Sequence, residues 1–157
     1  MPCECLSQVL TSELRVPPWL QREGRRAIEG MTAAARALHQ GRAGTAAIDI
    51  AQTAMDLKLR YRSPHEIDLG RAALWGQQVV VDAEDGDLEA VTGDTAVLGW
   101  IRNRFVHAVD ELAATHVDAL LLALGEGVAD EDLAAASRAG RRLTRLLESI
   151  HPNADNS

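Results

Sequence analysis

At residues 63–81 the chain reads SPHEIDLGRAALWGQQVVV, and this stretch decides the fold class. Ser63 suits the N-cap of a helix, Pro64 is tolerated in the first turn, and Glu66 can return a hydrogen bond to the backbone of Ser63. This pattern is a capping box. It predicts a helix that starts at Ser63, carries apolar residues as far as Val81, and stops at the acidic turn Glu84-Asp85-Gly86.

Apolar residues recur at steps of three and four on both sides of this stretch, which is the period of one-sided helices. The pattern predicts further helices over about residues 18–40, 45–62, 94–124 and 130–150, with a short helix at 87–91. We expect breaks at Gly41 and Gly44, an N-cap at Asp94 and another at Asp130.

Composition supports the same fold class. Hydrophobic residues make up 46% of the 157 residues and aromatic residues only 3%, so the core must be aliphatic, which favours helix-on-helix packing. We therefore expect an all-α fold, a compact bundle of four to five antiparallel helices. The length fits one domain. We place this domain at residues 17–150, between a flexible N-terminal segment, 1–16, and a flexible tail, 151–157.

Charge and cysteine content exclude several classes of protein. The formal net charge of −7 weakens non-specific attraction to nucleic acid and to anionic lipid. No stretch approaches the roughly 18 apolar residues that span a bilayer, so we expect no membrane contact and a cytoplasmic protein. Cys3 and Cys5 are the only cysteines, which excludes a disulfide framework and leaves too few thiols for a cysteine metal site.

One short segment carries residue types suited to catalysis, Arg102-Asn103-Arg104-Phe105-Val106-His107. Arginine, a polar residue, three further residues and histidine, in a small all-α chain, resemble the signature of the HEPN superfamily. Many members of that family are bacterial metal-independent ribonucleases, found as toxins in toxin–antitoxin pairs or in defence systems. The resemblance implies an endoribonuclease that needs no cofactor, acts on RNA, and forms a homodimer with a composite site.

The chemistry suits these residue types, because the 2′-hydroxyl of RNA can attack the adjacent phosphate if a proton is moved and the phosphorane charge is neutralised. His107 could act as general base or acid. The planar guanidinium of Arg102 matches phosphate oxygens. Asn103 would orient His107 or the phosphate, and Arg104 would add substrate-binding charge.

The spacing of this motif sets a geometric condition. Five residues of uninterrupted helix turn by about 500°, which places Arg102 and His107 about 140° apart, so a shared phosphate site requires a break. Gly99 is the candidate for that break. Many toxin members of the family carry a tyrosine two residues after the histidine, which a partner antitoxin can modify, whereas this chain has Val109.

Three further groups of acidic and histidine residues lie close together in the sequence: His107 and Glu111; His65, Glu66 and Asp68; and Asp49 and Asp56. The Glu-x-x-His pairs of di-iron bundles are absent from the sequence, so we expect no metal site. His116 falls on an apolar helical stripe, which predicts a hydrogen-bonded core histidine. Trp19, Trp75 and Trp100 are expected to be core or interface anchors.

A second class of function competes with the ribonuclease. The chain could be a non-enzymatic helical interaction module, a regulatory or adaptor subunit in which the motif is a surface patch that contacts a protein partner. The two hypotheses differ in geometry. A ribonuclease needs Arg102 and His107 at one accessible site, whereas a module allows them to point apart while an exposed apolar face meets its partner. The apolar stripes exceed the needs of one small bundle, which also favours a homodimer.

Overall fold

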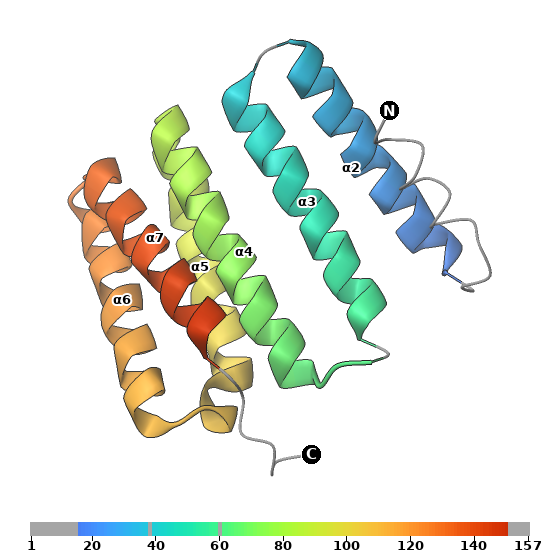
Figure 1. The fold of residues 1–157 in the computed structure, drawn as a ribbon. Coiled ribbons are helices and arrows are strands. Elements are labelled where there is room, and N and C mark those ends of the chain that lie inside the picture. The colour runs from blue at the N-terminus through green and yellow to red at the C-terminus, as the bar shows by residue number, and fades with distance from the viewer. Residues whose placement is uncertain (1–15, 38, 60, 151–157) are drawn as a thin grey trace. The chain divides into compact units, whose positions relative to one another are not determined.

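A computed structural model of the chain describes residues 16–37, 39–59 and 61–150. These residues form α-helices and one short 3₁₀ turn, without a β-strand among them, so the all-α prediction is confirmed. The elements, labelled as in Figure 1, are α2 (Pro18–Arg36), α3 (Gln40–Lys58), α4 (Pro64–Asp85), α5 (Leu88–Phe105), η1 (Val106–Ala108), α6 (Glu111–Ala129) and α7 (Leu133–Ser149). The expected flexible segments, apart from Val16, lie outside the described residues.

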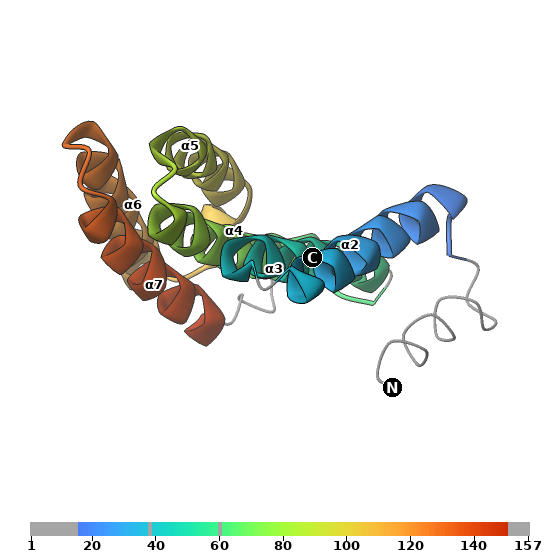
Figure 2. The ribbon, with the colours of Figure 1, turned by 90° about the horizontal axis from the view of Figure 1, so that it is seen from above.

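The helices divide into two units, one that ends at Leu57 and one that begins at Lys58. In the first unit, α2 and α3 run side by side in opposite directions (Figure 1). In the second unit, α4 to α7 form a four-helix arrangement in which α4 contacts α5 and α7, and α6 contacts the same two helices (Figure 2). Six helices are therefore described where four to five were expected, and the bundle proper consists of the last four.

The capping box at the start of α4 forms as predicted. The backbone N–H of Glu66 donates to Ser63 Oγ at 3.2 Å, and the backbone N–H of Ser63 donates to Glu66 Oε2 at 2.9 Å. The second of these bonds lowers the pKa of the Glu66 carboxyl. α4 ends where expected, because Gly86 adopts a positive φ of 81° that suits glycine.

Other boundaries differ from the sequence prediction, and each difference follows from a cap. α5 starts at Leu88, where Asp87 accepts a hydrogen bond from the Ala90 N–H at 2.9 Å, so Asp94 is an interior residue and not an N-cap. The single helix expected over about residues 94–124 is interrupted, because Asp110 caps a new helix, α6. Asp132, not Asp130, caps α7.

The expected break at Gly41 and Gly44 is also wrong. Both glycines lie inside α3, which begins one residue earlier than Gly41. A glycine in a helix interior costs about 1 kcal/mol relative to alanine, which a helix of 19 residues can tolerate. The turn between α2 and α3 lies instead just after Arg36.

The core of the C-terminal unit is aliphatic, as the composition predicted, and Phe105 is the aromatic residue among its buried members. α4 and α7 approach closely where two glycines face each other. A methyl group added at Gly76 would lie 2.6 Å from Thr144 Oγ1, and one added at Gly140 would lie 3.1 Å from the Gly76 carbonyl oxygen. Thr144 is fixed there by a hydrogen bond from its hydroxyl to the Ala73 carbonyl at 3.3 Å.

Candidate functional site

The motif spans the end of α5 and the turn that follows it. Arg102 and Asn103 lie in the last turn of α5, which ends at Phe105, and His107 lies on the 3₁₀ turn η1. Phe105 is buried in the core, which holds the end of α5 in place. The motif is therefore broken between Arg102 and His107, but not at Gly99, where α5 continues.

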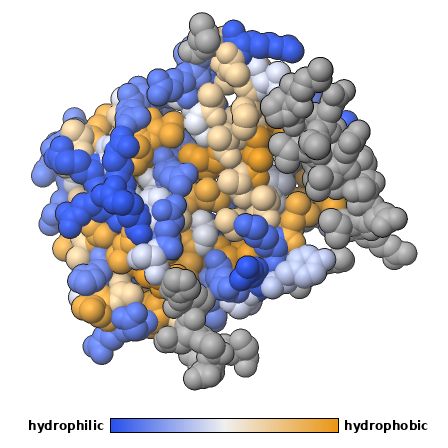
Figure 3. Space-filling view, viewed as in Figure 1, coloured by the Kyte–Doolittle hydropathy of each residue, from blue (hydrophilic) through white to orange (hydrophobic). Residues whose placement is uncertain are grey.

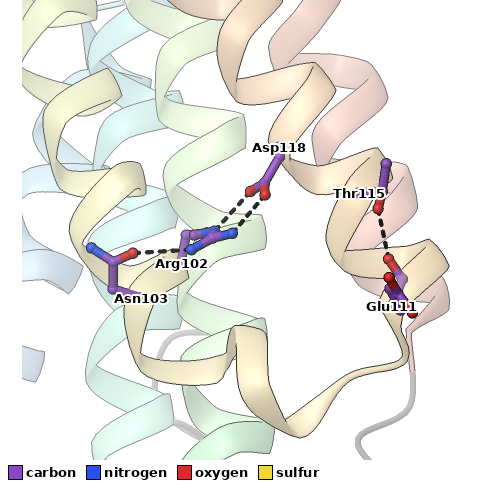
Figure 4. Close-up of polar contacts among 5 residues, drawn as sticks. All are labelled: Arg102, Asn103, Glu111, Thr115 and Asp118. Atoms are coloured by element: carbon purple, nitrogen blue, oxygen red, sulfur yellow. Dashed lines mark hydrogen bonds and ion pairs between the residues drawn. The ribbon is translucent and has the colours of Figure 1, made fainter.

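Arg102 forms an ion pair with a carboxylate on the next helix. Its Nε donates to Asp118 Oδ1 at 2.7 Å and its Nη2 donates to Asp118 Oδ2 at 2.6 Å, a two-pronged ion pair between α5 and α6 (Figure 4). Its Nη1 donates to Asn103 Oδ1 at 3.2 Å. The Nε–Nη2 edge of the guanidinium, which binds Asp118, also has the geometry to bind a phosphate. A phosphate at this edge would have to compete with Asp118.

Arg104 also binds a carboxylate, on a different helix. Its Nε lies 3.0 Å from Asp68 Oδ2, and the Asp68 side chain is only 4% exposed. Asp68 belongs to the first turns of α4, so the ion pair joins the end of α5 to the start of α4. Because a buried carboxylate needs a partner, Arg104 has a structural role in this arrangement.

His107 contacts a second imidazole. Its ring meets the ring of His65 edge-on, with 5.1 Å between the ring centroids and an angle of 90° between the planes. His107 is exposed, whereas His65 is half-buried and its Nδ1 has no hydrogen-bond partner. His65 lies in the first turn of α4.

The four predicted site residues are thus held by different helices. Arg102 is bonded to Asn103 and to Asp118 of α6, whereas Arg104 and His107 contact residues of α4. Among the described contacts, Arg102 and His107 do not interact with each other. One copy of the chain therefore does not bring the arginine and the histidine together by direct contact.

Sequence reasoning missed the three residues that position the motif, namely His65, Asp68 and Asp118. Asp68 and Asp118 lie 36 and 16 residues from the arginines that they bind. No local pattern marks such pairs, because they depend on how the helices pack. His65 and Asp68 were considered only as parts of a metal cluster, and within the described residues no group of three or more His, Cys, Asp or Glu side chains could hold a metal ion.

A pair of acids between α4 and α5 was also missed. Asp94 is 7% exposed, its Oδ2 lacks a hydrogen-bond partner, and it lies beside Asp82. Burial, a hydrogen bond with Asp82 and the charges of Asp82 and Asp87 raise the pKa of Asp94 to about 7. Gln78 Nε2 donates to both carboxylate oxygens of Asp82 at 2.9 Å.

The N-terminal unit has a groove of its own between α2 and α3. Its volume is about 340 Å³, and its lining mixes charged, polar and small residues: Glu23, Arg26, Ala27, Gly30, Ala46, Asp49, Gln52, Thr53 and Asp56. The predicted pair Asp49 and Asp56 lies here. The groove contains none of the motif residues, which all belong to the C-terminal unit.

α6 exposes more apolar surface than was expected. His116, predicted to be a core histidine, is exposed, and the leucines Leu112 and Leu122 are 66% and 65% exposed. α6 is 19 residues long and, by length and composition alone, apolar enough to cross a bilayer, although the sequence suggested no such stretch. Polar residues are spread among the apolar ones in α6, so that no unbroken apolar run is visible in its sequence.

The tryptophans are not equally buried. Trp75 is half-buried and packs against the core of the C-terminal unit, whereas Trp19 is 48% and Trp100 81% exposed. Trp100 is therefore not a core residue.

The chain was also compared with known proteins. No family model, no curated protein and no solved structure matches it.

Proposed function

We propose that this protein is a cytoplasmic, non-enzymatic helical interaction module that acts by presenting the exposed face of α6 to a protein partner. The observation that carries the proposal is the composition of α6. α6 is, by length and composition, apolar enough to cross a bilayer, and a helix of such composition in a folded domain is ordinarily mostly buried. Only 22% of the apolar segment of α6 is buried, through contacts with α5 and α7.

The exposed leucines of α6 are large apolar side chains, and their transfer out of water lowers the free energy. Burying one such side chain contributes about 1.5–3 kcal/mol. In the space-filling view, hydrophobic surface interrupts the hydrophilic surface over the region of α6 and α7 (Figure 3). Apolar surface rimmed by charged groups is typical of a protein-interaction site.

The contacts of the motif support this proposal over the ribonuclease. The guanidinium of Arg102 is engaged by Asp118, the guanidinium of Arg104 by the buried Asp68, and the imidazole of His107 lies against His65. Each motif residue thus has a structural partner that would keep it in place without catalysis. The ribonuclease that the HEPN resemblance implies, with its homodimeric composite site, remains the competing prediction.

RNA cleavage decides between the two classes of function. Purified full-length protein, Arg102→Ala and His107→Ala are incubated with RNA in EDTA near neutral pH, after circular dichroism has confirmed that all three are folded. We expect no cleavage by any of them. Cleavage by the unmodified chain that both variants lose would overturn the module and establish the metal-independent ribonuclease.

Photo-crosslinking in cells tests the binding face itself. A photo-crosslinking amino acid replaces Leu122 in the full chain, and a control chain carries it at Glu148, an exposed residue of α7. We expect light-dependent protein adducts at position 122 and few at position 148. Equal labelling at both positions, or no adduct at position 122, would contradict the proposal.

A further inference from the structure

The groove between α2 and α3 is lined by charged side chains of both signs. Glu23 and Arg26 line it from α2, and Asp49 and Asp56 line it from α3. In the described part of the chain, the side chains of Glu23, Arg26 and Asp49 form no ion pair, although they border the same groove. The guanidinium and these two carboxylates can therefore bind a ligand without first breaking an ion pair.

A side-chain amide in the same groove lacks a hydrogen-bond acceptor. Gln52 lines the groove from α3, three residues after Asp49, and is half-buried. Its Nε2 is shielded from solvent, and no acceptor for it is present among the described residues. A buried donor without an acceptor is unfavourable. A ligand oxygen that Gln52 reaches by a turn of its amide would remove this cost.

The antiparallel helices set the order of these groups along the groove. Gly30 lies beside Ala46, because a methyl group added at Gly30 would lie 3.9 Å from the Ala46 Cβ atom. Since α2 and α3 run in opposite directions (Figure 1), Arg26 lies near the level of Asp49 and Gln52. The guanidinium and the amide thus form a donor-rich part of the groove, with one carboxylate next to it.

Two further carboxylates lie toward one end of the groove. Asp56 follows Asp49 by seven residues, so both lie on the same face of α3, about 10 Å apart along the helix. Glu23 lines the α2 side and lies closer to the level of Asp56 than Arg26 does, because the helices are antiparallel. The groove therefore offers one carboxylate beside its donors and two more farther along.

We propose that this groove binds a free basic α-amino acid, with lysine as the model ligand. The α-carboxylate accepts hydrogen bonds from Arg26 and Gln52, and the α-ammonium group lies against Asp49. The side-chain cation lies against Glu23 and Asp56. The groove volume of about 340 Å³ is near the lower end of the range of ligand pockets, roughly 300–1,000 Å³, which suits a molecule of this size.

The charges of the groove select this class among small ligands. Three carboxylates and one guanidinium line the groove, which gives it a formal net charge of −2. A basic amino acid carries two cations and one carboxylate, so each of its charges meets an opposite charge. An acidic amino acid would bring a second carboxylate to this negative groove. A diamine would leave Arg26 and the amide of Gln52 without an acceptor. The site belongs to the N-terminal unit and does not depend on the function proposed for α6.

Isothermal titration calorimetry of the full-length protein tests the ligand class. The probes are L-lysine, pentane-1,5-diamine, which is lysine without its carboxylate, and L-glutamate. We expect a dissociation constant on the order of 100 µM for lysine. The diamine should bind about tenfold more weakly or worse, because it offers nothing to Arg26 and Gln52, and glutamate should give no measurable binding. No binding of lysine at up to about 10 mM would overturn the site. Equal affinity for lysine and the diamine would overturn the amino acid as its ligand.

Three variants, each confirmed as folded by circular dichroism, test the residues. Asp49→Asn should weaken lysine binding about tenfold or more. Glu29→Gln is the matched control, because it removes a charge from an exposed residue of α2 outside the groove lining, and should change the affinity less than about twofold. Gln52→Leu should weaken lysine binding about threefold or more and leave diamine binding unchanged, since only lysine has an acceptor. Equal losses in Asp49→Asn and Glu29→Gln would show a response to overall charge and overturn the site. A Gln52→Leu variant that binds lysine as well as the unmodified chain would overturn the assigned pose.

Discussion

Replacing Asp94 with asparagine should stabilise the protein at about pH 8 and change its stability little at about pH 4. Asp94 is buried between α4 and α5 beside a second carboxyl, Asp82. Asparagine has nearly the same shape and cannot ionise, and its amide can donate a hydrogen bond to Asp82. The substitution therefore removes the cost of a buried charge and preserves packing.

The magnitude follows from the two pKa values of Asp94. The carboxyl titrates near 3.8 in the unfolded chain and at about 7 in the folded protein, so between these values the folded protein retains a proton that the unfolded chain has lost. Asp94 then favours folding most at low pH. Its contribution falls by about 1.4 kcal/mol per pH unit from about pH 4 to about pH 7, to a total of about 4 kcal/mol at most. Because Asp82 shares the interaction, we expect Asp94→Asn to recover about 1–3 kcal/mol at pH 8.

Urea unfolding of both chains, followed by circular dichroism at several pH values, measures this difference. Asp85→Asn is the control, because it removes the same charge from an exposed residue of α4 and should change the stability by less than about 0.5 kcal/mol. Parallel pH profiles for the unmodified chain and Asp94→Asn would refute the reasoning. Lower stability of Asp94→Asn at pH 8 would show that the carboxylate is required in the fold.

Four further predictions concern stability. Gly76→Ala should destabilise the protein by about 1–3 kcal/mol, because the added methyl group clashes with α7. Gly93→Ala has open space around it and should be neutral or stabilise the protein by up to about 1 kcal/mol. Urea unfolding of both variants measures this difference in stability. Ser63→Ala should cost about 1 kcal/mol by removal of the capping box, and loss of less than about 0.3 kcal/mol would contradict this role. Arg102→Ala should cost less than about 1 kcal/mol, because its ion pair is partly exposed, and a thermal melt would show a larger loss if the pair were essential to folding. A fragment that begins at Lys58 should unfold cooperatively by itself; failure to fold would favour the single domain expected over residues 17–150.

Local interactions explain what could be read correctly before the structure was known. The start and end of α4 depend on groups within four residues of one another, the Ser63 and Glu66 bonds and the positive φ of Gly86, so the sequence predicts them. The errors at α5 and α6 arose among equivalent local choices. The short helix expected at 87–91 and the helix expected from Asp94 are one continuous helix, α5, so Asp87 is its N-cap and Asp94 is a buried interior residue.

The sequence by itself determined the helical class, the aliphatic core and the position of the motif, because periodicity, composition and caps act over a few residues. Only the tertiary structure decided the environment of the motif. Arg102 could have faced a phosphate, but it lies against Asp118, 16 residues away, and His107 lies against His65. The tertiary structure also decided which face of α6 is buried. α6 carries leucines on several faces, so its sequence does not single out one buried face, and packing against α5 and α7 left Leu112 and Leu122 exposed.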